Sequence, residues 1–86
     1  PLDLVRRLSA AQIPVVAYGG SPEILKCDCV LSDHENGAFQ LTRHLIEQGR
    51  RRIVCVAPSG AWPFWFRQRV AGYERAMKEA GLRPST

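Results

Sequence analysis

The chain has few of the features that assign a protein to a class at sight. None of its hydrophobic runs approaches the roughly 18 residues that a membrane-spanning helix needs, so no membrane association is expected. It has no internal repeat and no low-complexity tract, and only three of its residues are cysteines. With 86 residues, 45% hydrophobic and 23% charged, it has the composition of one small globular domain or a piece of a larger one.

The three cysteines form neither a disulfide framework nor a metal motif. Cys27 and Cys29 stand two apart in a strand-like run, so both side chains point to one face and are poorly placed for a disulfide. Cys55, within "RIVCVA", has the setting of a small buried hydrophobic residue. No metal site and no cofactor are expected, because a Cys-x-x-Cys pair and a matched histidine pair are both missing. Unpaired cysteines are typical of a reducing, cytoplasmic compartment.

Acidic residues are outnumbered by basic ones, and the formal net charge is +4. The densest basic stretch is "GRRRI", residues 49–53, where Gly49 has the position of a helix C-cap. Cations there complement the negative end of the helix dipole. Neither a helix-turn-helix nor a zinc finger accompanies them, so we do not expect this stretch to bind DNA or RNA directly.

The pattern of apolar residues predicts strands alternating with helices, which indicates an α/β fold with a mainly parallel sheet. The predicted elements are a helix over 3–11, a strand over 13–19 buried on both faces, a loop or short turn, a strand over 27–32, a helix over 33–49, a buried strand over 53–57 and a helix over 67–82. The faces expected to pack are Ala38, Leu41 and Leu45 in one helix, and Val70, Tyr73, Met77 and Ala80 in the other.

The first residues read as the end of an amphipathic helix. Its apolar face consists of Leu4, Val5 and Leu8. The partner of this face must lie elsewhere, so we expect the chain to be a fragment of a longer protein.

The stretch "SGAWPFWFRQR", residues 59–69, holds four of the seven aromatic residues. It leaves the carboxyl end of the strand predicted over 53–57, where ligands bind in open parallel sheets. Arg67 and Arg69 fall at the predicted start of the last helix, where the dipole disfavours cations, so a hydroxyl-rich or anionic ligand would offset the cost. Aromatic rings beside a guanidinium are also suited to hold a sugar ring. The alternative is an aromatic lid packed on another subunit or a core edge, with the arginines solvated.

An enzyme is not expected. "YGGSPE" follows a strand but lacks the spaced glycines of a dinucleotide-binding turn. Asp33, His34 and Glu35 are consecutive, so their side chains diverge and cannot form a catalytic triad by themselves.

Three stretches together carry a resemblance to a known family: "IPVVAYGG", "VLSDHENGAFQLTRHLIEQGRRRIVCVAPSG" and "RQRVAGYERAMKEAGL". They resemble the effector-binding core of lactose-repressor/galactose-repressor-type transcriptional regulators, which is related to periplasmic sugar-binding proteins. The resemblance runs from about residue 13 to 82. One block combines Asp33 and Gly37 with "HLIEQGRRRI", and the other is Arg69 followed by "AGY".

The resemblance implies a periplasmic-binding-protein-like (type I) fold with two similar α/β subdomains and an effector in the cleft between them. The chain crosses between subdomains near Asp33 in this family, so residues 1–32 would end the first and residues 33–86 would begin the second. The strands over 27–32 and 53–57 would then belong to different sheets.

The resemblance also implies which residues bind the effector. Arg69 would contact it, and the segment from Trp62 to Phe66, with Phe64 and Trp65 within it, would shape specificity. His34, at the crossover, would bond the effector or cap a helix. Tyr18, at the end of its strand, would line the cleft or belong to the core or rim.

Asp33 and the two glycines after the first strand are not expected to bind the effector. Asp33 is expected to cap the following helix rather than bind the effector. The family often places an acidic effector contact after the first strand, where this chain has Gly19 and Gly20, so that contact is missing or supplied elsewhere.

The function expected from the resemblance is the sensing core of a cytoplasmic transcriptional regulator. A sugar-like or nucleoside-like effector would control the binding of operator DNA by an N-terminal domain outside this chain, and the intact protein would be a homodimer. The alternative is an exported sugar-binding protein of a transport system, which the unpaired cysteines and the arginine-rich turn disfavour.

Overall fold

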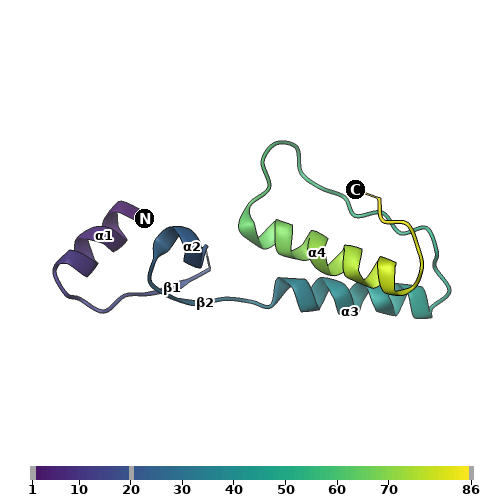
Figure 1. The fold of residues 1–86 in the computed structure, drawn as a ribbon, viewed down its shortest axis with the longest axis horizontal. Helices are drawn as coiled ribbons and strands as arrows, with labels where there is room; N and C mark the ends of the chain where they lie inside the picture. The colour runs from purple at the N-terminus through teal and green to yellow at the C-terminus, as the bar shows by residue number, and fades with distance from the viewer. Residues whose placement is uncertain (1, 20, 86) are drawn as a thin grey trace. The chain divides into compact units, whose positions relative to one another are not determined.

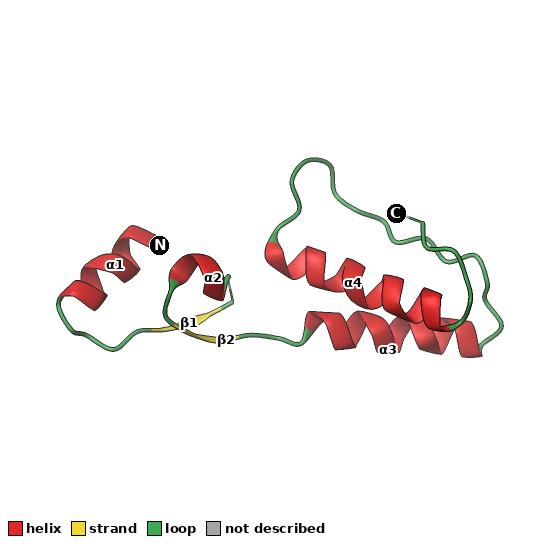
Figure 2. Cartoon of the chain, viewed as in Figure 1, coloured by secondary structure: helices red, strands yellow, loops and turns green. Residues whose placement is uncertain are grey.

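The computed structural model of the chain describes residues 2–19 and 21–85. Its elements are α1 (Leu2–Ala10), β1 (Val16–Tyr18), α2 (Pro22–Leu25), β2 (Asp28–Val30), α3 (His34–Glu47) and α4 (Phe64–Glu79), shown in Figures 1 and 2. They form two compact units, residues 1–32 and 33–86. That these units end one effector-binding subdomain and begin another stays a prediction.

The first unit contains a parallel pair of short strands. β1 and β2 pair with Val16 opposite Asp28 and Tyr18 opposite Val30. The connection between them, expected as a loop or short turn, contains the single helical turn α2. Pro22 begins that turn because its fixed φ suits the first helical position and its missing N–H has no helical partner to lose.

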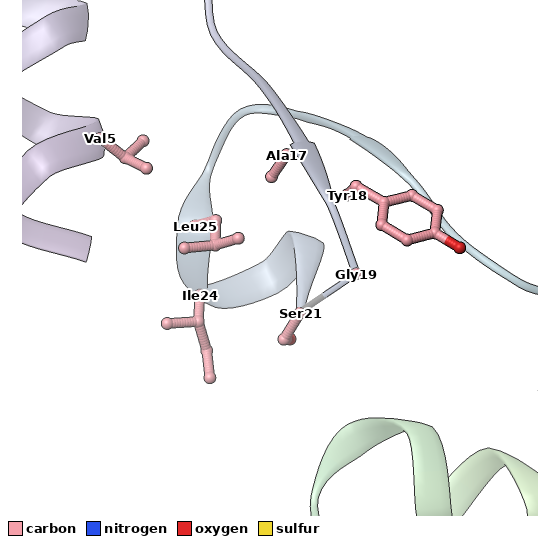
Figure 3. Close-up of a pocket in the computed structure, with 7 residues that line it drawn as sticks. All are labelled: Val5, Ala17, Tyr18, Gly19, Ser21, Ile24 and Leu25. Carbon is pink, nitrogen blue, oxygen red and sulfur yellow. The ribbon is translucent and has the colours of Figure 1, made fainter. Parts of the chain in front are cut away.

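β1 is shorter than predicted and is not buried on both faces. Val16 is 66% exposed and Tyr18 83% exposed, while Ala17 between them is half-buried. Figure 3 shows α1 and α2 on the side to which Ala17 points, with Tyr18 directed to the other side of the strand. Among the described elements of this unit, none covers that other side, so the prediction of a doubly covered strand is wrong for this chain.

The second unit is built on two helices that run in the same direction (Figure 1). α3 begins after Asp33, whose carboxylate accepts a hydrogen bond from the backbone N–H of Asn36 at 3.1 Å, which confirms the predicted N-cap. The turn after α3 passes through Gly49 at φ 91°, a conformation that favours glycine.

The core of the second unit lies along one side of α4. Its buried residues are Phe66, Val70, Tyr73, Ala76 and Met77, which recur at helical spacing and form one apolar stripe. Three of the four predicted core positions on this helix are confirmed. The prediction for Ala80 is wrong: it is the C-cap residue, beyond the last packed turn, and it is exposed.

The packed side of α3 differs by one position from the predicted one. Ala38 and Leu45 are half-buried as expected, but Leu41 is 63% exposed. Thr42 is the buried residue, so the packed stripe runs through Ala38, Thr42 and Leu45 at helical spacing.

The segment over 53–57 was predicted to be a buried strand, and this prediction is wrong for the chain. The segment has no strand assignment, and Val56 within it is 84% exposed. One backbone hydrogen bond, from the N–H of Cys55 to the carbonyl of Ser85 at 3.0 Å, links it to the region after α4. The hydroxyl of Tyr73 lies within hydrogen-bonding distance of the carbonyls of Ile53 and Ser85. A strand needs a ladder of partners, and the described residues supply little of one.

The aromatic segment is also more helical than predicted. α4 begins at Phe64, directly after Pro63, which is extended at ψ 162° and serves as the N-cap. Arg69 therefore lies in the second turn of α4, and only Arg67 lies in the first. Because the dipole effect falls off within the first turn, the predicted conflict with the helix dipole applies to Arg67 and not to Arg69.

α3 and α4 are in close backbone contact at Gly72. A Cβ atom there would fall on the backbone carbonyl oxygen of Glu35 and would lie 2.9 Å from the backbone nitrogen of Phe39. Glycine inside a helix is unfavourable by about 1 kcal/mol relative to alanine. The close contact between the two backbones accounts for its presence.

We expect Gly72→Ala to lower the free energy of unfolding by about 1–3 kcal/mol, because the added methyl group forces the helices apart. Gly37→Ala is the matched control, since its Cβ would meet nothing within 4 Å, and it should raise stability by about 0.5–1 kcal/mol through helix propensity. Denaturant unfolding of the protein measures both. Equal stabilities of the two variants would contradict the close packing.

Candidate functional site

Three of the predicted effector-binding residues come together at the N-terminal ends of α3 and α4. His34 is the first residue of α3, while Trp65 and Arg69 lie one turn apart on α4. The Nε–H of Arg69 donates to Nδ1 of His34 at 3.4 Å, although the two residues are 35 apart in sequence. The guanidinium carbon of Arg69 lies 4.7 Å from the centroid of the Trp65 ring. We call these three residues the Arg69 cluster.

The position of the Trp65 ring is set by the core beneath it. Trp65 contacts buried Phe66 edge-on, with ring centroids 5.9 Å apart, and is itself 42% exposed. Its ring lies 6.5 Å from that of His34. Trp62 packs against the same Phe66 at 5.3 Å, and its Nε1–H donates to the carbonyl of Pro58 at 3.2 Å. Phe66 is thus a core residue that supports both indoles.

A hollow of about 360 Å³ lies beside the Arg69 cluster. Its lining residues are Asp33, His34, Gly37, Ala38, Leu41 and Arg69. We call it the α3 hollow. Its volume is within the range of small-molecule sites, and its lining combines polar groups with the apolar side chains of Ala38 and Leu41. One carboxylate oxygen of Asp33 is used in capping α3.

Two predicted effector-binding residues lie outside the Arg69 cluster. Phe64 is half-buried, and the guanidinium over its ring is that of Arg67, at 5.9 Å, rather than that of Arg69. Tyr18 belongs to the other unit. It borders an open, mainly apolar hollow formed by α1, α2 and β1, and its ring lies on the opposite side of β1 from Ala17 (Figure 3).

The sequence analysis did not assign Ala38 and Leu41 to the site. Both were expected to pack in the core, yet they line the α3 hollow. They follow His34 at helical spacing and so share its side of α3. This helical spacing is the feature of the sequence that could have assigned Ala38 and Leu41 to the site.

Two further features bear on the class of protein. Among residues 2–19 and 21–85, no three His, Cys, Asp or Glu side chains gather in a way that could hold a metal ion. None of the described helices combines the length and the hydrophobicity needed to cross a bilayer.

Comparison with known families gives one match that covers nearly the whole chain. Residues 2–86 match the family described as periplasmic binding proteins and sugar binding domain of the LacI family. No solved structure matches the chain.

Three of the curated proteins that match carry the names of transcriptional regulators. The HTH-type transcriptional repressor PurR of Vibrio campbellii is 36% identical over 73 residues, which are 84% of this chain and 21% of that protein. The catabolite control protein A of Priestia megaterium is 31% identical over 78 residues, 91% of this chain and 24% of that protein. The HTH-type transcriptional regulator DegA of Bacillus subtilis is 26% identical over 81 residues, 94% of this chain and 24% of that protein. The chain thus spans between a fifth and a quarter of the length of these relatives.

All three cysteines are free thiols. Burial raises the pKa of the Cys29 thiol, and the neighbouring Cys27 raises it further. Burial also raises the pKa of the Cys55 thiol, with a smaller contribution from the Glu74 carboxylate. Since the thiolate is the reactive form, a raised pKa lowers the reactivity of both thiols at neutral pH.

We therefore expect Cys29 and Cys55 to react slowly with Ellman's reagent at neutral pH in the folded protein. Variants that retain a single cysteine isolate each thiol, and the same variants in denaturant supply the reference rate. Raising the pH should accelerate the folded-state reaction as each thiol ionises. A folded-state rate equal to the denatured-state rate would contradict the raised pKa.

Proposed function

Because the chain belongs to the family of periplasmic binding proteins and LacI-family sugar-binding domains, we propose that it is part of the effector-sensing core of a transcriptional regulator. The names of its relatives, which are repressors and regulators of transcription, support this role over that of an exported transport protein. In this proposal the intact protein is a cytoplasmic homodimer that binds operator DNA through an N-terminal domain outside this chain. Its chemistry is binding and release, with no catalytic step.

The effector we propose is a sugar-like or nucleoside-like small molecule. The observation that carries this proposal is the placement of Arg69, whose guanidinium stacks on Trp65 and bonds His34 at the edge of the α3 hollow. An indole offers a flat apolar surface to a sugar or base ring, and a guanidinium offers several donors to its oxygen atoms. Phe64 and Tyr18 remain proposed contacts of the same effector.

In the intact protein, residues 1–32 would end the first effector-binding subdomain and residues 33–86 would begin the second. The exposed apolar side chains of β1 and of the segment over 53–57 fit this proposal. Val16, Val54 and Val56 are all more than half exposed, and their alternation with half-buried neighbours is that of strands with one uncovered face. Further strands and helices of a longer protein would cover them.

We expect Arg69→Ala to weaken effector binding by about 1.5–3 kcal/mol, the range for a hydrogen bond that involves a charged group. Calorimetry with D-galactose, D-ribose and adenosine on the intact protein measures the affinity. The matched control is Arg43→Ala, because Arg43 lies on α3 and pairs with Glu47 at 3.9 Å, outside the α3 hollow. The proposal fails if none of the three compounds binds, or if the folded Arg69 variant binds as tightly as the control.

Trp65→Ala distinguishes a binding surface from an aromatic lid. We expect affinity to fall by about 0.5–1.5 kcal/mol through lost stacking, with little change in melting temperature, because the ring is partly exposed and buried Phe66 remains beneath it. Trp65→Phe should recover part of the affinity. Thermal melts and titrations on the same samples decide, and a destabilised variant with normal affinity would show that Trp65 is a lid.

A further inference from the structure

Two contacts restrain the guanidinium of Arg69 in different ways. Stacking on Trp65 at 4.7 Å restricts the plane in which the group lies. The hydrogen bond from Nε–H to His34, at 3.4 Å, restricts its rotation within that plane. The remaining N–H donors, all on the terminal nitrogens, stay available. The described side-chain contacts of His34 are with Arg69 and Trp65, so the imidazole is placed to restrain the guanidinium.

The direction of this hydrogen bond determines the protonation state and the tautomer of His34. Arginine has donors only, so Nδ1 of His34 must be the acceptor. The imidazole is then neutral and carries its proton on Nε2. His34 and Arg69 together therefore offer donors, and the carboxylate of Asp33, which also lines the α3 hollow, offers an acceptor.

On these grounds we propose that His34 is a positioning residue for effector recognition. Its neutral imidazole holds Arg69 so that the terminal N–H groups of the guanidinium face an edge of the effector that carries hydrogen-bond acceptors. This inference rests on the proposed function, because it concerns the same site. It assigns to His34 an action through Arg69 that the sequence, which offered helix capping or direct contact, did not predict.

Such positioning favours binding because the Arg69 side chain is ordered before the effector binds. A free arginine side chain loses rotamer freedom when it is immobilised by a ligand. The contacts with His34 and Trp65 already restrict the rotamers of Arg69 before binding. The loss of side-chain entropy when the effector binds is therefore smaller. Removing the imidazole should weaken binding even if His34 never touches the effector.

The first test needs no effector. The Nε–H resonance of Arg69, observed in the protein with 15N-labelled arginine, reports its hydrogen bond. We expect His34→Ala to shift this resonance and to speed its exchange with water. His34→Asn should preserve it, since the amide oxygen can accept in place of Nδ1 and does not titrate. His44→Asn is the matched control, because His44 is the other histidine of α3 and is exposed.

The second test measures affinity for D-galactose, D-ribose and adenosine. For whichever compound binds, we expect His34→Ala to weaken binding by about threefold to tenfold, the effect of one hydrogen bond, and His34→Asn to restore it. The control His44→Asn should bind as tightly as the unmodified protein.

The outcomes separate the two proposals. An Arg69 resonance that His34→Ala leaves unchanged would overturn the positioning role. Binding that depends on Arg69 but not on His34 would do the same, with the proposed function intact. The Arg69 resonance could respond to the His34 substitutions as expected while the protein binds none of the three compounds. That outcome would support the positioning role and reject the proposed effector class.

Discussion

At Gly72 the backbone of α4 lies so close to the backbone of α3 that no side chain fits between them. This contact joins the first turns of α3 to the middle of α4, and it holds the two helices parallel along their length (Figure 1). The apolar stripe of α4, from Phe66 to Met77, is buried as a result. The N-terminal ends of both helices are brought to the same end of the unit, and there the imidazole of His34 meets the guanidinium of Arg69. The candidate site is made from residues far apart in sequence, and its assembly depends on the lack of a side chain at Gly72.

The core and the candidate site are in direct contact. Phe66 is buried, yet Trp62 and Trp65 both rest against its ring. Trp65 then supports Arg69 one helical turn later. Further along the stripe, the hydroxyl of Tyr73 accepts a hydrogen bond from the N–H of Ser85 at 2.8 Å and so ties the segment after α4 to the helix. Rigid packing on one side of α4 is therefore what allows the exposed side to present aromatic and cationic groups in a fixed order.

The sequence predicted best what depends on local interactions. The N-cap at Asp33, the left-handed turn at Gly49 and most of the buried stripe on α4 all follow from helical spacing and from the conformational preferences of single residues. Predictions that required distant partners were less successful. The apolar run over 53–57 indicated a buried strand, but strand formation depends on neighbours in a sheet, which the described chain does not provide. Arg69 and the aromatic segment that contains Trp65 were named from residue chemistry and from the family resemblance, and His34 from the resemblance alone. The contact between His34 and Arg69 depends on the packing at Gly72, for which one glycine within a helical pattern gave no clear signal.

The most direct measurement for the proposed site is amide hydrogen exchange of the intact protein with and without saturating D-galactose, D-ribose or adenosine. If the effector binds at the N-terminal ends of α3 and α4, exchange should slow in residues 34–41 and 64–69. The C-terminal turns of both helices, which lie at the far end of the unit, should be little affected. Slower exchange confined to those C-terminal turns, or unchanged exchange in residues 34–41 and 64–69 when a compound is bound, would contradict the assignment of the site.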